Sequence, residues 1–324
     1  MKPFKVFVAS PIQPEAEEYL ATFCEYEKWN GPAGPTEEQI ASKLADKDGL
    51  YVEGEQLVSR TLLDQAPNLR AVSNASVGYN NFDLAAMKER GIIGTNTPGI
   101  LDDTVADLVF GLMLSVGRRI CELDRLVKDG LWQTSDYPKF YGTEVHHKTL
   151  GIIGMGRIGE TVAERAKYGF CMNLIYHNRS RKPDVEARLA VEYASLPDLL
   201  CRSDYIVLIT PYTKETHLMI GAEQFALMKK TAIFINVSRG RTVDEKAMAK
   251  ALQNGVIAGA GLDVYTHEPI EKDSPLLQLK NTVTLPHIGS ATSQTKLDMA
   301  MAAVDNLRLM LNGEKPASTV PELR

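Results

Sequence analysis

The sequence predicts an α/β protein made of two Rossmann-like, doubly wound parallel-sheet domains with a cleft between them. Short apolar segments alternate with amphipathic helical segments along the chain, which is typical of βαβ units. Two apolar segments, Tyr205–Ile209 and Ile233–Val237, are almost continuous, as expected of strands buried on both faces of a sheet. The segments fall into two series separated by a turn-rich stretch, which indicates two domains.

The first series predicts a small parallel sheet. Its expected strands are Phe4–Ala9, Gly49–Val52, Arg70–Asn74 and Ile92–Gly94, and its expected helices are Glu15–Cys24, Glu37–Ala45 and Asp83–Glu89. Valine, isoleucine and aromatic residues are frequent in these strands, as they are in pleated, half-buried surfaces. Helices between parallel strands imply right-handed crossover connections.

The second series predicts a larger sheet. Its expected strands are Thr149–Ile153, Asn173–His177, Tyr205–Ile209, Ala232–Val237, Ala258–Leu262 and Thr282–Leu285. A long apolar helix, Asp103–Arg118, precedes this series. Its apolar residues Val105, Leu108, Val109, Leu112, Met113 and Val116 suit either an interface between two copies of the chain or an ordinary core.

Two turn-rich segments mark the expected domain boundaries. Gly94–Gly99 precedes the long helix, and Pro286–Gly289 ends the second series, so we expect hinges near Thr95–Asp102 and Pro286–Thr292. The final helix, about Ser293–Leu311, carries apolar residues at helical spacing and could cap either domain.

Composition excludes several classes of protein. The 324 residues include 44% hydrophobic and 24% charged residues, and the net charge is −5, which argues against nucleic acid or an anionic membrane as the main partner. No apolar run reaches the roughly 18 residues of a membrane span, and the N-terminus is typical of a first strand instead of a signal peptide. The four cysteines are widely spaced, which indicates reduced thiols, a cytoplasmic location and no metal site.

A phosphate-binding loop is predicted at Gly154-Met-Gly-Arg-Ile-Gly159. The motif follows the strand Thr149–Ile153 and opens a helix through about Gly169, which is the context that a dinucleotide site requires. Gly154 would allow the tight turn, Gly156 the close approach of a pyrophosphate, and Gly159 the packing of helix on strand. The alternative is a glycine-rich turn without a ligand.

The next strand end bears on the choice of nicotinamide cofactor. NAD sites carry an acidic residue about 20 residues after the glycines. Here the expected strand ends at His177, and the chain continues without an acid through Asn178, Arg179, Ser180 and Arg181. Cations and a hydroxyl at this place suit a 2′-phosphate, so we predict NADP(H) as the preferred cofactor with NAD(H) as an alternative. The other interpretation is a solvated basic loop.

Three chemistry-bearing residues follow three successive strands. Arg239, Glu268 and His287 each lie just beyond an expected strand end, where open α/β sheets meet their ligands. A permanently charged guanidinium, a carboxylate and an imidazole together suit binding of an anionic substrate with proton transfer. The alternatives are a buried ion pair between Arg239 and Glu268 and a packing role for His287.

These motifs carry a family resemblance through almost the whole chain. The supporting stretches are Ser76–Asp83, Asn96–Gly99, Thr104–Asp107, Val145–Gly159, Asn236–Gly240, Gly261–Asp263 and Pro286–Gly289. They resemble the D-isomer-specific 2-hydroxyacid dehydrogenase superfamily, and within it most closely the glyoxylate, hydroxypyruvate and 2-ketogluconate reductases. The resemblance implies that residues 1–100 with 289–324 form a flavodoxin-like substrate domain and that residues 101–288 form the dinucleotide-binding Rossmann domain.

The resemblance also implies a reaction and roles for particular residues. The chain would be an oxidoreductase that reduces a small 2-keto acid to the D-2-hydroxy acid, with Arg239 holding the substrate carboxylate, His287 donating the proton and Glu268 orienting His287. The backbone of Val77 and Gly78 would bind the carboxylate from the other domain. Asp263 would face the nicotinamide or serve only as a turn cap. The implied cofactor-binding residues are Thr104, Gly154, Gly156, Arg157, Ile158, Gly159, Asn178, Arg179, Ser180, Arg181, Thr210, Pro211, Val237, Ser238, Asp263 and Ser290.

Other functions on the same scaffold stay open. A dehydrogenase of the D-lactate, phosphite or formate type would share most of these motifs, and so would a dinucleotide-sensing binding protein such as a corepressor. The resemblance further implies a homodimer, and the charge and hydropathy of the chain argue against nucleic acid or a membrane as a partner.

Overall fold

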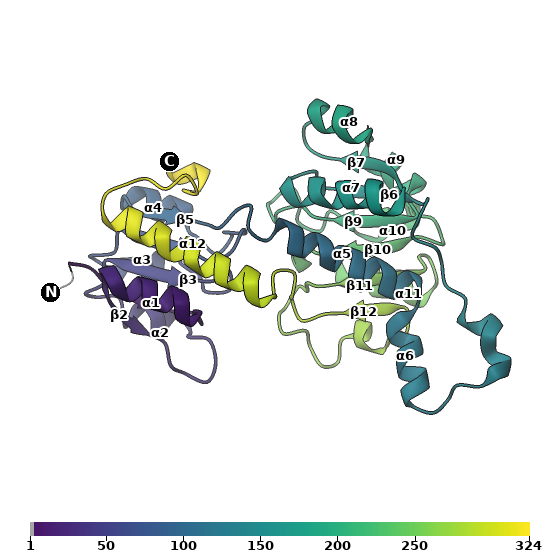
Figure 1. The fold of residues 1–324 in the computed structure, drawn as a ribbon, viewed down its shortest axis with the longest axis horizontal. Helices are drawn as coiled ribbons and strands as arrows, with labels where there is room; N and C mark the ends of the chain where they lie inside the picture. Colours follow the sequence, from purple (N-terminus) through teal and green to yellow (C-terminus); the bar gives the residue numbers. More distant parts are fainter. Residues whose placement is uncertain (1–2) are drawn as a thin grey trace. The chain divides into compact units, whose positions relative to one another are not determined.

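The computed structural model describes residues 3–324 and divides the chain into two compact units. Unit 1 comprises residues 1–101 and 290–324, and unit 2 comprises residues 102–289. Figure 1 shows the chain entering unit 2 once and returning to unit 1 for its last helix, α12 (Ser293–Leu311). The unit limits lie one residue from the domain limits expected from the sequence.

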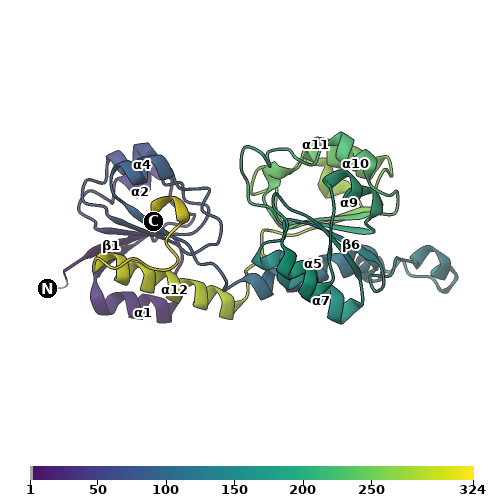
Figure 2. The ribbon, with the colours of Figure 1, turned by 90° about the horizontal axis from the view of Figure 1, so that it is seen from above.

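Unit 1 contains a five-stranded sheet in the order β2-β1-β3-β4-β5, with every neighbouring pair parallel. Its strands are β1 (Lys5–Val8), β2 (Glu25–Lys28), β3 (Gly49–Val52), β4 (Ala71–Asn74) and β5 (Ile93–Thr95). Helices α1 (Pro14–Phe23) and α12 cover one face, and α2 (Glu37–Ala41), α3 (Arg60–Asp64) and α4 (Leu84–Glu89) lie on the other (Figure 2). This strand order reverses between β1 and β3, which is the switch point of a flavodoxin-like sheet.

The final helix therefore packs on the sheet of unit 1. Val304, Leu307 and Leu311 of α12 belong to the same buried cluster as Val6 and Val8 of β1, with none of the five more than 2% exposed. The helical periodicity alone left this choice open.

Unit 2 contains a seven-stranded parallel sheet in the order β12-β11-β10-β9-β6-β7-β8. Its strands are β6 (Thr149–Ile153), β7 (Asn173–His177), β8 (Glu192–Tyr193), β9 (Tyr205–Leu208), β10 (Ile233–Asn236), β11 (Gly259–Leu262) and β12 (Thr282–Thr284). Helices α5 (Asp102–Gly117) and α7 (Arg157–Phe170) cover one face, and α9 (Leu196–Arg202), α10 (Ala222–Leu227) and α11 (Glu245–Gln253) cover the other, while α8 (Pro183–Leu189) follows β7. Two all-parallel α/β sheets confirm the predicted fold class.

Helix α5 is a core helix. Val105, Val109, Leu112 and Met113 are at most 6% exposed, and Leu108 and Val116 pack against the same cluster as the strands of unit 2. Four of these six side chains are therefore buried as in an ordinary core, while Leu108 and Val116 are half-buried, and an interface between two copies stays a prediction.

An arm, residues 120–142, follows α5. It contains α6 (Ile120–Lys128) and the 3-10 helix η1 (Thr134–Phe140), and neither of these two helices has a buried residue. Arg119, the residue before the arm, links the two ends of the arm. Its side chain donates to both carboxylate oxygens of Glu122 and to the carbonyl of Lys139 at 2.5 Å. Exposed apolar side chains on the arm are Ile120, Val127, Leu131, Trp132, Tyr137 and Tyr141.

Candidate active site

The phosphate-binding loop has the backbone that its sequence predicts. Gly154 has a φ of +106°, and a Cβ at this position would lie 2.6 Å from the carbonyl oxygen of Ile209. A Cβ on Gly159 would lie 2.3 Å from the carbonyl oxygen of Gly154, so its absence lets α7 pack directly on the turn. A Cβ on Gly156 would meet no protein atom within 4 Å, which shows that the space beside this residue is open to a ligand.

The N-terminus of α7 opens onto the same space. Gly156 caps the helix without a side-chain hydrogen bond, so the first N–H groups of a 14-residue helix stay available to an anion. Ile158 packs into the core, and Arg157 lies 3.3 Å from the carboxylate of Asp102 through its Nε. The loop and the helix end therefore fit a dinucleotide pyrophosphate.

The end of β7 carries cations in place of a carboxylate. His177 is fixed by a 3.0 Å hydrogen bond between its Nδ1 and the carbonyl of Ala194, and its ring stacks on Tyr193. Asn178 donates to the carbonyl of Ser180 at 3.2 Å. Arg179 and Ser180 are exposed, and Arg179 makes no hydrogen bond or ion pair within residues 3–324.

Arg181 is held by a carboxylate of helix α8. Its guanidinium donates to both carboxylate oxygens of Glu186, at 3.1 and 2.5 Å, and it lies over the ring of Tyr193. Glu186 also accepts the hydroxyl of Tyr176 at 2.7 Å. Of the two arginines, Arg179 is therefore the one available to a ligand.

The remaining residues predicted for the cofactor lie at neighbouring strand ends of unit 2. Thr210 and Pro211 follow β9, and a Cβ on Gly154 would lie 3.1 Å from the N of Thr210. Val237 and Ser238 follow β10. Ser238 is 4% exposed, and its hydroxyl donates to Oδ1 of Asn236 at 2.8 Å and lies 3.0 Å from the hydroxyl of Thr242. Thr104 lies in the first turn of α5.

Arg239, Glu268 and His287 follow β10, β11 and β12, three adjacent parallel strands. The Nδ1 of His287 lies 2.6 Å from Oε2 of Glu268, and Oε1 of Glu268 accepts the N–H of Tyr265 at 2.9 Å. An Nδ1–H that donates to a carboxylate leaves Nε2 as the ring nitrogen directed to other partners. Arg239 is half-buried and donates to the carbonyl of Ser238 at 2.7 Å.

Gly240 brings the arginine loop and the glutamate loop together. A Cβ at this position would lie 1.8 Å from the carbonyl carbon of Tyr265, so only glycine allows the two backbones to approach so closely. The N–H of Thr266 is held by Glu245, the first residue of α11, at 2.5 Å. Glu245 and Tyr265 are positioning groups that sequence reasoning missed, because neither carries a motif of its own.

The charges of the three residues depend on one another. Burial lowers the pKa of Arg239, and the neighbouring carboxylate of Glu268 opposes that change. Burial alone would raise the pKa of Glu268, but hydrogen bonds from His287 and from the Tyr265 N–H outweigh it, and this pKa lies below its ordinary value. Glu268 is therefore a carboxylate at neutral pH and faces the imidazole of His287 as an anion.

Asp263, at the end of β11, holds the backbone that follows His287. Its two carboxylate oxygens accept the N–H of Ile288 at 2.7 Å and the N–H of Gly289 at 2.9 Å, and the residue is 2% exposed. Burial raises the pKa of Asp263, and these two hydrogen bonds oppose the rise. Of the two interpretations of Asp263, these contacts match the turn cap.

Val77, Gly78 and Ser290 belong to unit 1. The carbonyl of Val77 accepts the side chain of Asn96 at 2.8 Å, and that of Gly78 accepts the side chain of Asn74 at 2.7 Å. The two N–H groups of Val77 and Gly78 form no hydrogen bond within the part of the chain that the structure describes. The carbonyl of Ser290 accepts the N–H of Thr292 at 3.0 Å.

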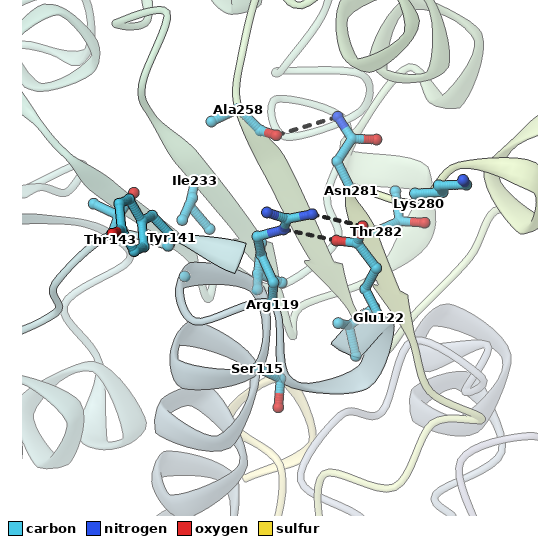
Figure 3. Close-up of a pocket in the computed structure, with 14 residues that line it drawn as sticks. Ser115, Arg119, Glu122, Tyr141, Thr143, Ile233, Ala258, Lys280, Asn281 and Thr282 are labelled. Atoms are coloured by element: carbon cyan, nitrogen blue, oxygen red, sulfur yellow. Dashed lines mark hydrogen bonds and ion pairs between the residues drawn. The ribbon is translucent and has the colours of Figure 1, made fainter. Parts of the chain in front are cut away.

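A separate pocket of about 190 Å³ lies at the amino ends of three strands of the unit 2 sheet. Figure 3 shows its lining around Ile233, Ala258 and Thr282, at the amino ends of β10, β11 and β12, where Arg119 and Glu122 pair with each other. The candidate catalytic residues follow the carboxyl ends of the same strands, so this pocket is not part of their site.

Within residues 3–324, no group of three or more His, Cys, Asp or Glu side chains could hold a metal ion. In the same range, no helix is long and apolar enough to cross a membrane.

Comparisons with known proteins agree with this geometry. The family described as D-isomer specific 2-hydroxyacid dehydrogenase, NAD binding domain, matches residues 110–289. Glyoxylate/hydroxypyruvate reductase B of Klebsiella pneumoniae is 51% identical over 278 residues, which is 86% of either chain. The protein of the same name from Escherichia coli K12 is 50% identical over 279 residues, again 86% of either chain.

Solved structures give the same result over the full length. A Thermus thermophilus protein has a TM-score of 0.91 at 38% identity and covers 98% of this chain and 99% of its own. An NADPH-dependent glyoxylate/hydroxypyruvate reductase from Sinorhizobium meliloti, solved with NADP and malonate, has a TM-score of 0.88 at 31% identity and covers 100% of this chain and 98% of its own. The resemblance inferred from the motifs is confirmed, and the chain belongs to the D-isomer specific 2-hydroxyacid dehydrogenase family.

Proposed function

We propose that the protein reduces a small 2-keto acid, glyoxylate or hydroxypyruvate, to the D-2-hydroxy acid with NADPH. The observation that carries this proposal is the pair of His287 and Glu268 beside Arg239, on the sheet whose first βα turn is the phosphate-binding loop. The names of the relatives at about half identity support the same substrates.

Arg239 binds and polarises the substrate in this proposal. A half-buried guanidinium stays charged in proteins, and its forked donors suit a carboxylate with an adjacent carbonyl oxygen. The free N–H groups of Val77 and Gly78 are donors for the same carboxylate. Charge that develops on the carbonyl oxygen is stabilised by the fixed positive charge of Arg239.

His287 supplies the proton. Glu268 holds its Nδ1–H, so a protonated ring carries its second proton on Nε2, from which it passes to the carbonyl oxygen of the substrate. The reduced nicotinamide, when bound, supplies the hydride that the keto carbon accepts. The products are the 2-hydroxy acid, the oxidised cofactor and a neutral imidazole that regains its proton from solvent.

Unit 2 is the dinucleotide-binding domain and unit 1 the substrate domain in this proposal. NADPH is preferred because Arg179 is exposed and donates no hydrogen bond within residues 3–324, and because no carboxylate directly follows β7 to repel a 2′-phosphate. NADH remains a weaker cofactor. The four cysteines, which lie within residues 3–324, form no disulfide bond, in keeping with action in the cytosol.

A second copy of the chain covers the arm in this proposal. Leu131, Trp132 and Tyr141 of the arm are 64%, 53% and 74% exposed, and exposed apolar clusters of this kind mark protein interfaces. Light scattering at micromolar concentration should give the mass of a dimer. A monomer mass would refute this part of the proposal.

Steady-state kinetics test the proposed activity. Glyoxylate, hydroxypyruvate, pyruvate and 2-ketogluconate are each assayed with NADPH and with NADH. The proposal expects the highest kcat/KM for glyoxylate or hydroxypyruvate with NADPH. The absence of turnover with all four acids, in a protein that still binds NADPH, would refute it and would favour a dinucleotide-sensing protein.

A further inference from the structure

A second polar cluster lies in unit 1, where β1 and β3 end. Ser10 donates its hydroxyl to Oε1 of Gln56 at 2.5 Å, and the N–H of Glu53 contacts both the Ser10 hydroxyl and Oε1 of Gln56 at 2.9 Å. Side chains thus fix the main chain at Glu53, the first residue after β3. No role in the reaction described above uses Glu53.

One oxygen of the Glu53 carboxylate forms an ion pair, and the other accepts no hydrogen bond from residues 3–324. Its Oε2 lies 3.4 Å from Nζ of Lys296, and the two side chains are 27% and 32% exposed. Its Oε1 accepts no hydrogen bond from any of residues 3–324. Burial raises the pKa of Glu53, and Lys296 opposes the rise.

Lys296 pairs with Glu53 from an electrostatically unfavourable position. It lies in the first turns of α12, where the helix dipole disfavours a cation. An anion at Glu53 compensates for this placement. The long separation of 3.4 Å leaves the carboxylate only loosely neutralised, so it remains a strong acceptor for a hydroxyl.

Glu53 lies next to the backbone donors for the substrate carboxylate. Val52 pairs with Asn74 in the register of β3 and β4, and the N–H of Ala75 donates to the carbonyl of Val52 at 2.8 Å. A Cβ on Gly54 would lie 3.2 Å from the hydroxyl of Ser76. The loop that begins at Glu53 therefore runs in contact with the loop that contains Val77 and Gly78, one strand spacing apart, and this spacing is comparable to the length of a three-carbon acid.

We propose that Glu53 determines specificity by accepting a hydrogen bond from the C3 hydroxyl of hydroxypyruvate and by repelling substrates that carry a second carboxylate. The inference rests on the proposed function, because it takes the substrate carboxylate to bind Val77 and Gly78. Glyoxylate has no C3, so Glu53 contributes nothing to its selection. Oxaloacetate carries a carboxylate on C3, which would face the carboxylate of Glu53.

The test compares the wild type with Glu53→Gln, which keeps the shape of the side chain and removes its charge. For each, kcat/KM is measured with glyoxylate, hydroxypyruvate and oxaloacetate at saturating NADPH, together with the melting temperature. Glu55→Gln is the matched control, because Glu55 is an exposed acid two residues away. We expect Glu53→Gln to lower kcat/KM for hydroxypyruvate by about tenfold, the usual worth of a hydrogen bond to a charged group. Glyoxylate should change by less than about twofold and oxaloacetate should gain.

The outcomes separate this inference from the proposed function. Failure of the wild type to reduce glyoxylate and hydroxypyruvate would refute the proposed function itself. An active wild type whose ratio of hydroxypyruvate to glyoxylate kcat/KM is the same in Glu53→Gln would refute only the specificity role. An equal loss of kcat/KM with all substrates, together with a lower melting temperature, would show that the Glu53–Lys296 pair only stabilises the packing of α12 near β3. That outcome would also refute the specificity role.

Discussion

The Nδ1 of His287 and the Oε2 of Glu268 lie 2.6 Å apart, although the two residues follow different strands and are 19 positions apart in the chain. The second oxygen of Glu268 is fixed by the N–H of Tyr265 at 2.9 Å. A carboxylate held at both oxygens fixes the orientation of the imidazole ring. The proposed proton donor is therefore placed before any substrate arrives.

Replacement of His287 by alanine should lower kcat by roughly two to four orders of magnitude, the usual worth of a general acid. His267→Ala is the matched control, since His267 is exposed and lines a different pocket with Glu271 and Asp273. Steady-state turnover of glyoxylate measures both. Near wild-type turnover in His287→Ala, with a large loss in His267→Ala, would assign the proton donor to His267.

Glu268→Gln should remove the acid limb of the pH profile of kcat/KM that comes from loss of the Glu268 charge. In the wild type the pKa of Glu268 is lowered, so its carboxylate is present at neutral pH and is lost only as the pH falls through that lowered pKa. The variant carries no charge to lose, so its kcat/KM should be lower at neutral pH and should not fall further through that titration. The profile is measured with glyoxylate from acid to neutral pH. A variant that keeps the acid limb of the wild type would contradict the role given to Glu268.

The paired substitution Asn178→Asp with Arg179→Ala should abolish the preference for NADPH. It removes a cation from the 2′-phosphate and adds a repelling charge, and one or two charged hydrogen bonds account for roughly tenfold to several-hundredfold discrimination. Arg181→Ala is the control and should keep the preference, because Glu186 already holds Arg181. The measurement is kcat/KM for both cofactors, and equal values in the wild type would show that the loop is only a solvated surface.

Gly240→Ala should lower the free energy of unfolding by about 1–3 kcal/mol or more, since its Cβ would overlap the backbone of Tyr265. Activity should fall with it, because the loops of Arg239 and Glu268 would be forced apart. Gly111→Ala is the control on an exposed face of α5, where a Cβ meets nothing within 4 Å, and it should stabilise the protein by about 0.5–1 kcal/mol. Denaturant unfolding compares the two, and equal stabilities would contradict the close approach at Gly240.

The sequence predicted the elements whose pattern reflects burial. Strands β6 and β7 begin and end where expected, because both are apolar strands of a sheet covered on its two faces. Strands β2 and β8 were missed, since Glu25–Lys28 and Glu192–Tyr193 are polar edge strands with no apolar alternation. Helix α2 ends at Ala41, four residues before its expected end, because the turns after Ser42 take over.

Site residues divide in the same way. Arg239, Glu268 and His287 could be predicted because each directly follows a recognisable strand, and the order of parallel strands then brings them together. Two ion pairs could not be predicted from the sequence, because they depend on side-chain directions across separate elements: Arg181 with Glu186, and Glu53 with Lys296. Glu245 and Tyr265 likewise act through contacts with a neighbouring loop that no local pattern records.

Asp263 anchors the segment after His287 through main-chain N–H groups, and this has a consequence for how the segment can evolve. An anchor that recognises only the backbone tolerates any side chain at Ile288 that fits its half-buried surroundings. Proline is the exception at positions 288 and 289, because it has no N–H to offer. The anchor therefore sets no chemical requirement for the side chain at position 288, whereas it does require two acceptor oxygens at position 263.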